Sequence, residues 1–583
     1  MIRAPAGAPR WASPPANRTN YLEVSLPSVP WWQSAAIYQL YVRSFADGNG
    51  DGTGDLAGVR AHLPYLAALG IDAIWFNPWY PSPMADAGYD IADYRSIEPV
   101  FGTLADADAL IAEAHAYGIK IIVDVVPNHA SDQHPWFRAA LAAGPGSVER
   151  SRFWFRSGRG SDGSLPPNNW RSIFGGPAWT RVVEADGSWG EWYLHLFAPE
   201  QPDFNWSSPE VRLEFENVLR FWFSRGVDGI RIDSAALLCK DPALPDVAAD
   251  AEPGPSHPFT DRDEVHLVYQ SWRAIADSYP GRMLIGEVWL PDATRLARYV
   301  GPGELHTVFN FPYLNCPWEA TELRQVIDQT LALSSGAPAT WVLSNHDVDR
   351  VVSRYGRPDT AFSLDRRPYF HALPVDVALG TRRSRAAALL TMALPGSVYL
   401  YQGEELGLWE VPDIPDELRQ DPIWARTHGA DPGRDGSRVP LPWSGTEPPF
   451  GFSPAGASTD PWLPQPKEWR DLTVAAESAL TDSMLALYRE ALRIRRSAPA
   501  LGDGPMAWQP SAPGVLAFDR TIDPASGPAS GPATGADGVL RCVANLSADS
   551  VALPPDAAVL LASGPLDGGL LPPDTTVWLR LPR

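Results

Sequence analysis

Residues 229–234 read Gly-Ile-Arg-Ile-Asp-Ser, a short apolar strand that contains Arg231 and ends at Asp233. Residues two apart on a strand point to the same face, so these two charges are neighbours. Opposite charges are costly to bury unless they are paired or used. Taken alone, the stretch is typical of an exposed edge strand, but Glu287 and Asp347 also stand at the ends of short apolar runs. Three acids at three strand ends predict a site at one rim of a parallel barrel.

The composition predicts a globular protein of two or three domains, since the chain has 583 residues of which 45% are hydrophobic and 20% charged. With 47 basic and 69 acidic residues the net charge is −22, so we expect neither nucleic acid nor an anionic membrane as a partner. The three cysteines, Cys239, Cys316 and Cys542, suggest no disulfide framework. We see neither an apolar run of membrane-spanning length nor the apolar segment of a signal peptide, and therefore expect a cytoplasmic protein.

Apolar runs alternate with helical segments along most of the chain, which predicts an α/β fold, a (β/α)8 TIM barrel. The eight expected strands lie at 36–42, 73–77, 119–124, 230–233, 283–287, 307–311, 339–344 and 397–401. The clearest helices are expected at 59–69, 104–117, 210–225 and 484–497.

Changes in composition predict where the domains begin and end. We expect an N-terminal arm at 1–30, barrel segments at 31–130 and 204–502, an inserted irregular subdomain after the third strand at 131–203, and a C-terminal antiparallel β-sandwich at 503–583. Residues 523–537 form a low-complexity Gly/Pro/Ala/Ser segment, which predicts a mobile loop.

Residues 47–55 read Asp-Gly-Asn-Gly-Asp-Gly-Thr-Gly-Asp, with an oxygen-bearing side chain at every second position. This alternation predicts a tight loop that wraps oxygen ligands around one Ca²⁺ or Mg²⁺, and the alternative is a plain cluster of Gly-Asp turns. The expected ligands are Asp47, Asn49, Asp51, Thr53 and Asp55. Because the loop follows the first strand, away from the three acids, we expect a structural ion, and no organic cofactor.

Four segments resemble the signature regions of the α-amylase superfamily, glycoside hydrolase family 13. They are Asp-Val-Val-Pro-Asn-His at 124–129, Gly-Ile-Arg-Ile-Asp at 229–233, Gly-Glu-Val-Trp at 286–289 and Ser-Asn-His-Asp at 344–347, in the order and spacing of the family. Residues 201–206, Gln-Pro-Asp-Phe-Asn-Trp, resemble a fifth region in the form found in the α-glucosidase and oligo-1,6-glucosidase branch. The resemblance runs from Trp31 to the end of the chain.

The resemblance implies a retaining mechanism with Asp233 as nucleophile, Glu287 as general acid/base and Asp347 as stabiliser of the transition state. Arg231 would hold Asp233 ionised by lowering its pKa, because a nearby cation favours the carboxylate. Glu287 would have to stay protonated near neutral pH.

The resemblance also implies a glucose-binding pocket. His129 and His346 would donate hydrogen bonds to the non-reducing glucose, and Tyr89 would stack on it. Asp90 and Arg438 would close the inner end of the pocket, which makes such enzymes exo-acting.

The resemblance also implies roles for Ser234 and Lys240, which follow the nucleophile in the sequence. Ser234 would border the leaving group, where the resemblance implies that valine favours α-1,6 bonds and smaller or polar residues favour α-1,4 bonds. Lys240 resembles a lysine that replaces a calcium ion near Asn128, since an ammonium is a compact charge; the alternative is a solvated loop lysine.

The sequence therefore predicts an α-glucosidase that acts on short α-1,4-linked substrates such as maltose. A trehalose synthase, sucrose isomerase, sucrose phosphorylase or oligo-1,6-glucosidase would share the three acids, so these alternatives stay open. A non-catalytic, transporter-associated relative is a more distant alternative, because such proteins usually lack part of the triad and carry a membrane anchor.

Overall fold

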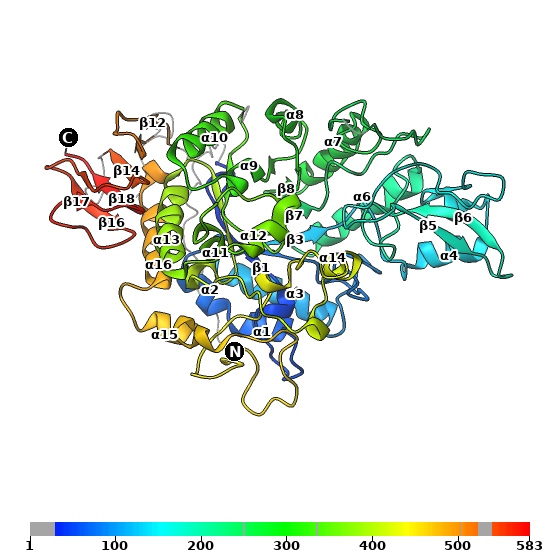
Figure 1. Ribbon diagram of the computed structural model, residues 1–583, viewed down its shortest axis with the longest axis horizontal. Helices are drawn as coiled ribbons and strands as arrows, with labels where there is room; N and C mark the ends of the chain where they lie inside the picture. Colours follow the sequence, from blue (N-terminus) through cyan, green and yellow to red (C-terminus); the bar gives the residue numbers. More distant parts are fainter. Residues whose placement is uncertain (1–28, 249–250, 334–335, 503, 523–538, 583) are drawn as a thin grey trace, which may run out of the picture. The chain divides into compact units, whose positions relative to one another are not determined.

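The computed structural model describes residues 29–248, 251–333, 336–502, 504–522 and 539–582. Nearly all of the predicted arm at 1–30, and the whole predicted loop at 523–537, lie outside these residues. All helices and strands described below belong to one compact unit that begins at Trp31 (Figure 1).

Eight parallel strands form the central sheet, and each of them was predicted from the sequence. They are β1 (Ala36–Leu40), β2 (Ala73–Phe76), β3 (Lys120–Val125), β7 (Gly229–Ile232), β8 (Met283–Gly286), β9 (Thr307–Val308), β10 (Thr340–Val342) and β11 (Ser397–Tyr401). Their order is β10-β11-β1-β2-β3-β7-β8-β9. The Thr340 hydroxyl donates to the Val308 carbonyl at 2.5 Å, so a side chain links the two end strands of this nearly closed barrel.

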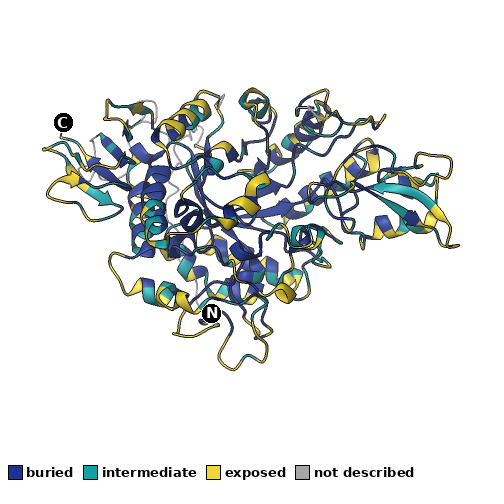
Figure 2. Ribbon diagram, in the orientation of Figure 1, coloured by how far each residue is buried: buried dark blue, intermediate teal, exposed yellow. Residues whose placement is uncertain are grey.

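The strands are buried on both faces, as expected for a parallel barrel covered by helices (Figure 2). Alternate residues fill the barrel interior, where Ile37, Trp75, Ile122, Ile285 and Tyr399 belong to one apolar cluster. The remaining strand residues pack outward against helices. The barrel is therefore a solid core, and its chemistry is confined to the rim.

The larger helices between the strands are α3 (Leu104–Ala116), α6 (Pro209–Ser224), α7 (Glu264–Asp277), α10 (Ala320–Leu333), α13 (Val377–Ala393) and α16 (Met484–Ser497). Shorter ones are α8 (Ala293–Arg298), α9 (Phe311–Asn315), α11 (Val351–Tyr355), α12 (Arg367–Ala372), α14 (Pro422–Arg426) and α15 (Val474–Ser478). A capping box at Thr103 and Asp106 fixes the start of α3. Among the described residues, no helix has both the length and the apolar character needed to cross a membrane.

The helix predicted at 59–69 is two helices, α1 (Leu56–Ala61) and α2 (Leu63–Leu69), which meet at His62. Pro64 lies in the first turn of α2, where a missing amide hydrogen costs nothing. The same proline cannot continue a helix that begins in α1, because it lacks the amide hydrogen and its ring clashes with the preceding turn. The apolar periodicity of 59–69 predicted one helix because it does not detect this interruption.

The insertion at 131–203 is more regular than predicted. It contains α4 (Pro135–Ala143), α5 (Val148–Ser151), and a sheet of β4 (Phe155–Arg156), β6 (Trp189–Leu194) and β5 (Trp179–Val183). Trp154, Trp170 and Trp179 pack with Leu194 and Leu196 into a separate small core. The many aromatic residues of this stretch therefore build a core of their own.

Two antiparallel sheets form the C-terminal region, as predicted. The larger has the order β12 (Met506–Trp508), β13 (Val515–Arg520), β14 (Leu540–Asn545), β18 (Thr575–Arg580), β16 (Ala558–Ala562), and the smaller pairs β15 (Val551–Ala552) with β17 (Leu570–Leu571). The Trp578 indole donates to the Leu389 carbonyl of α13 at 3.0 Å and joins this region to the barrel. The short strands β12, β15 and β17, of two or three residues each, were not predicted from the sequence.

Candidate active site

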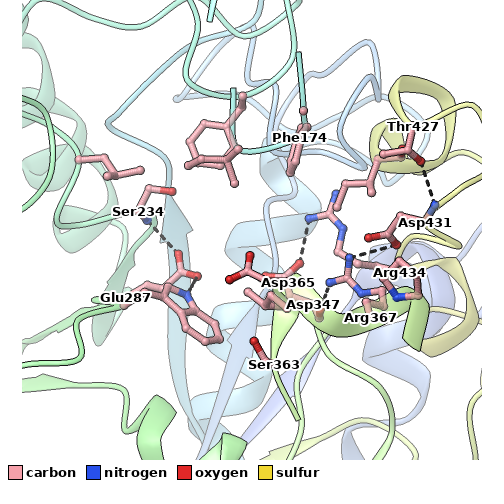
Figure 3. A pocket seen from close by; sticks show the side chains of 18 of the residues that line it. Phe174, Ser234, Glu287, Asp347, Ser363, Asp365, Arg367, Thr427, Asp431 and Arg434 are labelled. Carbon is pink, nitrogen blue, oxygen red and sulfur yellow. Dashed lines mark hydrogen bonds and ion pairs between the residues drawn. The ribbon is translucent and has the colours of Figure 1, made fainter. Parts of the chain in front are cut away.

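A cavity of about 730 Å³ is lined by residues that follow the barrel strands, by the inserted subdomain, and by the long loop after β11 (Figure 3). Glu287 and Asp347 supply carboxylates to it, and Ser234 lies beside Glu287. Phe174 comes from the insertion and Arg434 from the loop after β11. The three predicted acids thus meet at the rim, since Asp233 and Glu287 directly follow β7 and β8.

Arg231 joins the carboxylates on this side of the cavity. Its Nη1 lies 2.6 Å from Asp233 Oδ1 and 2.9 Å from Asp124 Oδ1, and its Nη2 lies 2.8 Å from Glu287 Oε2. A planar guanidinium suits this arrangement, because its several donors point in fixed directions. The sequence predicted the pair with Asp233 and missed the other two, because they come from separate strands.

The pKa values of the two reacting carboxyls are both raised. Burial raises the pKa of Asp233 to about 6, and Arg231 only partly opposes it. Burial raises the pKa of Glu287 to about 7, with Arg231 opposing and Asp233 and Asp347 adding to the rise. The predicted lowering at Asp233 is therefore wrong, because one cation is shared among three buried carboxylates. The predicted order, with the lower pKa at Asp233, is found.

Asp347 behaves differently from these two acids. Arg434 and Arg438 each place a guanidinium nitrogen 3.0 Å from its Oδ1. Burial would raise the pKa of Asp347, but the guanidiniums of Arg434 and Arg438 help to hold it well below its usual value. Asp347 therefore stays ionised, whereas the pKa values of Asp233 and Glu287 are raised.

Asp90 does not line the cavity, so the prediction that it closes the inner end together with Arg438 is wrong for Asp90. The Asp90 carboxylate is fully buried, and it accepts hydrogen bonds from the Ser82 hydroxyl at 2.9 Å and from the amides of Ala85 and Asp86, each at 3.0 Å. These bonds fix the turn of the loop.

The acid–arginine pair beside Asp347 is formed instead by Asp86 and Arg434. Arg434 Nη2 lies 2.7 Å from Asp86 Oδ1, and its Nε lies 2.6 Å from Asp421 Oδ2. Asp86 and Asp90 stand four residues apart in one loop, and the sequence does not tell which of them caps the turn. Asp421 comes from the long loop after β11, where no motif marked it.

The predicted glucose-binding residues Tyr89 and His346 lie side by side. Their rings stack with centroids 5.1 Å apart and planes 7° apart. The Tyr89 hydroxyl donates to Asp124 Oδ2 at 3.1 Å. Nε2 of His346 is buried 3.3 Å from Asp347 Oδ2, and among the described residues it has no hydrogen-bond partner.

His129 is also buried, with Nε2 3.0 Å from Gln201 Nε2. Burial lowers the pKa of His129 to about 3 and that of His346 well below its usual value. Both rings are therefore neutral at physiological pH, as a hydrogen-bonding rather than a charged role requires.

Ser234 and Lys240, which follow Asp233 in the sequence, both make specific contacts. Ser234 donates from its amide to Glu287 Oε2 at 2.9 Å and from its hydroxyl to Asp233 Oδ2 at 2.8 Å. Buried Lys240 places its ammonium 2.6 Å from Asn128 Oδ1 and 2.7 Å from Asp203 Oδ2. The predicted position of Lys240 beside Asn128 is confirmed.

Trp289 contacts Glu287. The sequence did not predict this contact, although Trp289 lies in one of the signature segments. Its indole Nε1 donates to Glu287 Oε1 at 3.0 Å, and its ring stacks on Phe311 with centroids 3.5 Å apart. Glu287 is thus held by Trp289 on one oxygen and by Ser234 and Arg231 on the other.

The predicted metal loop at 47–55 is folded around its own backbone amides. Asp47 accepts three amide hydrogen bonds from the loop and Asp55 accepts two, which leaves lone pairs on both carboxylates. Asp47 and Asp51 both add to the raised pKa of Asp55, which burial mainly causes. Within the described residues, none of the three acids forms an ion pair with a side chain, and the acid and histidine side chains close enough together to hold one ion are Asp349, His371 and Glu410, outside this loop. The metal site of the loop therefore stays a prediction.

Comparison with known proteins shows which family the chain resembles over most of its length. Residues 39–504 match the alpha amylase catalytic domain, and residues 531–578 match a domain of unknown function, DUF3459. A "Probable alpha-glucosidase" of Rhizobium meliloti (strain 1021) is 37% identical over 518 residues, covering 85% of this chain and 88% of that protein. The trehalose-6-phosphate hydrolase of Escherichia coli (strain K12) is 36% identical over 499 residues, covering 80% and 84%.

Solved structures agree with the sequence matches. An alpha-glucosyl transfer enzyme, XgtA, has a TM-score of 0.80 at 34% identity, over 95% of this chain and 100% of the other. The trehalulose synthase MutB of Pseudomonas mesoacidophila MX-45 has a TM-score of 0.79 at 30% identity, over the same shares. The chain therefore belongs to the alpha-amylase family of glycoside hydrolases, family 13.

Proposed function

We propose that this protein is a retaining, exo-acting α-glucosidase that releases α-glucose from the non-reducing end of short, uncharged α-glucosides. The observation that carries the proposal is the shared guanidinium of Arg231, which holds Asp233 and Glu287 together. With pKa values of about 6 and about 7, Asp233 is mostly ionised and Glu287 about half protonated at neutral pH. A nucleophile and a general acid need that order.

The proposed reaction has two steps. Asp233 attacks the anomeric carbon while Glu287 gives its proton to the departing oxygen, which forms a glycosyl–enzyme ester. Glu287 then removes a proton from water, which attacks the same carbon and releases Asp233. Asp347 is held ionised by Arg434 and Arg438, so it offsets the positive charge that develops on the sugar ring.

A closed inner end supports the exo action. Asp86, Arg434 and Asp421 form a buried ion-pair cluster next to Asp347. A glucose unit bound against Asp347 would meet these fixed charges on one side and the Tyr89–His346 stack on another. Such a cluster is costly to open, because separating one partner leaves a buried charge.

The charges around the cavity favour uncharged substrates over sugar phosphates. Four of its lining residues are acids: Glu287, Asp347, Asp365 and Asp431. Its two lining arginines are engaged, because Arg434 contacts three carboxylates and Arg367 lies 3.5 Å from Asp431. A phosphate would therefore meet net negative charge, and we expect trehalose 6-phosphate to be a poor substrate.

Ser234 supports a preference for α-1,4 bonds, as the sequence suggested. It lines the cavity beside Glu287, on the side where the leaving group must sit. Adding or removing one methyl-sized group in such a contact changes kcat/KM by roughly 10–200-fold.

A transglycosylase or isomerase is the second candidate, because both the glucosyl transfer enzyme and the trehalulose synthase share this fold over 95% of the chain. Incubation with maltose, isomaltose, trehalose, sucrose and trehalose 6-phosphate separates these functions by product. We expect maltose to be hydrolysed fastest, with α-glucose as the first anomer seen by proton NMR. Initial release of β-glucose, or transfer products in place of glucose, would contradict the proposal.

The loop at 47–55 is the proposed site of one structural Ca²⁺ or Mg²⁺. Asp47, Asn49, Asp51, Thr53 and Asp55 would hold it, and the ion would neutralise the three carboxylates of the loop without entering the reaction. Melting curves with and without a chelator test this role. We expect a lower Tm after chelation that returns with added Ca²⁺, and we expect Asp51→Asn to weaken that response.

A further inference from the structure

Ser234 donates hydrogen bonds to both reacting carboxyls, and it is a neutral donor beside the cation Arg231, which also contacts both. Its hydroxyl binds Asp233 Oδ2 at 2.8 Å, and its amide binds Glu287 Oε2 at 2.9 Å. Asp233 Oδ1 is bound by Arg231 at 2.6 Å, so each oxygen of the nucleophile has a different donor. The backbone of Ser234 has a φ of 48°, which few residues other than glycine adopt, and it directs both donors inward.

We propose that Ser234 is a positioning residue that balances the two steps of the reaction, because its hydroxyl stabilises Asp233 as a carboxylate and speeds its departure from the glycosyl–enzyme. This inference rests on the proposed function, in which Asp233 and Glu287 are the nucleophile and the acid/base.

The balance follows from how the acceptor strength of Asp233 changes. In the first step an Asp233 oxygen bonds to the anomeric carbon, the glycosidic C–O bond breaks, and the Glu287 proton moves to the leaving oxygen. Asp233 is now an ester, a weaker acceptor than a carboxylate, so the bond from Ser234 weakens. In the second step a water oxygen bonds to that carbon, its proton moves to Glu287, and the electron pair of the ester C–O bond returns to Asp233. The hydroxyl favours this return.

The charges around Asp233 do not favour its carboxylate form strongly, so a neutral hydrogen-bond donor can contribute to its stabilisation. The charged and titratable groups facing it are Arg231, Asp124, Glu287, Tyr89 and Tyr94. One cation faces two acids, so the setting opposes a further negative charge. Burial raises the pKa of Asp233, and the hydrogen bond from Ser234 lowers it. Loss of the hydroxyl should therefore move the acid limb of kcat/KM to higher pH.

The test compares the native enzyme with Ser234→Ala and Ser234→Gly, which both lose the hydroxyl. Glycine relieves the positive φ and alanine does not, so an effect common to both reports the hydroxyl alone. The substrate is 4-nitrophenyl α-glucoside, whose leaving group needs little protonation, so that the second step limits kcat. We expect kcat to fall roughly tenfold, the equivalent of one hydrogen bond to a charged group, and KM to fall with it. Mass spectrometry of acid-quenched enzyme should show the glycosyl adduct accumulating.

The proposal is overturned if both variants keep the native kcat, adduct level and acid limb, or if kcat and kcat/KM fall equally without an adduct. If the native enzyme hydrolyses no α-glucoside, the proposed function fails, and a ligand-free titration then decides the role of Ser234. Carbon-13 NMR would follow the carboxyl of Asp233, assigned with Asp233→Asn, in the native protein and Ser234→Ala. A titration midpoint at higher pH in the variant supports the proposal, and an unchanged midpoint overturns it.

Discussion

Two buried groups of carboxylates lie close to the ends of the barrel strands, and they are compensated in opposite ways. The catalytic group, Asp233, Glu287 and Asp347, is in contact with three arginines. The Glu404–Glu405 pair, which follows β11, is bound by hydroxyls from Tyr38, Tyr65, Ser344 and Tyr488 at 2.7–2.8 Å. Within the described residues, neither glutamate of the pair forms an ion pair.

The difference shows what decides the charge of a buried acid. Hydroxyl donors satisfy the oxygens of the Glu404–Glu405 pair but bring no positive charge, so burial raises the pKa of Glu404 to about 7 and also raises that of Glu405. Asp347, with two arginines, keeps a pKa well below its usual value. Two arginines for one acid keep Asp347 ionised, whereas hydrogen bonds alone, or one arginine shared by several acids, leave the pKa of a buried acid raised.

The largest effect is expected from removing the nucleophile. Asp233→Asn keeps the shape of the side chain but cannot form the glycosyl–enzyme, so kcat should fall by roughly 10⁴-fold or more. The melting temperature should stay near that of the native protein, because the variant removes one of three carboxylates that compete for Arg231. Glu405→Gln is the matched control in the other group and should keep nearly full activity. An Asp233→Asn enzyme with more than a hundredth of native activity would contradict the assignment.

A smaller but still severe effect is expected from Arg231→Met. This variant leaves Asp124, Asp233 and Glu287 buried together without their cation, which should cost about 3–5 kcal/mol of unfolding free energy. Urea unfolding at pH 8 measures the loss, and lowering the pH should recover part of it as the acids take up protons. The exposed pair of Arg366 with Asp359 provides the control, because Arg366→Met should cost less than about 1 kcal/mol. Equal losses in the two variants would show that Arg231 does not compensate these acids.

The same residues show which features of the fold and the site could be predicted from the sequence. The strands were predictable because buried parallel strands are continuous apolar runs, and Asp233, Glu287 and Asp347 because they end such runs. The sequence could not show that Asp86, and not Asp90, pairs with an arginine at the site. Both acids lie in one loop, and only the fold decides which of them caps the turn. Arg434 and Asp421 come from a long loop without a periodic pattern. The raised pKa of Asp233 was missed because neither burial nor the sharing of Arg231 can be read from a local motif.

The pH profile of kcat/KM gives a third test, with a milder effect. Asp233 must be ionised, so activity should fall about tenfold per unit below pH about 6. Glu287 must be protonated, so activity should fall likewise above pH about 7. The result is a narrow bell for maltose. A substrate with a good leaving group, such as 4-nitrophenyl α-glucoside, should lose the alkaline limb and keep the acid limb. A broad plateau from pH 5 to 9 with maltose would show that these two carboxyls do not limit the reaction.

The smallest effect is expected at Glu404, and it concerns stability alone. Its folded pKa of about 7 lies above the ordinary value of 4.5, so the folded state binds the proton more tightly than the unfolded state. The stabilisation from this proton is complete below pH about 4.5 and is lost as the pH rises through about 7. Glu404→Gln stays neutral at every pH and can still bind Ser344 and Tyr488. The native protein should therefore lose roughly 1–3 kcal/mol more of its unfolding free energy between pH 5 and pH 8 than the variant does. Urea unfolding at several pH values measures both curves, and parallel curves would show that Glu404 does not titrate in the folded protein.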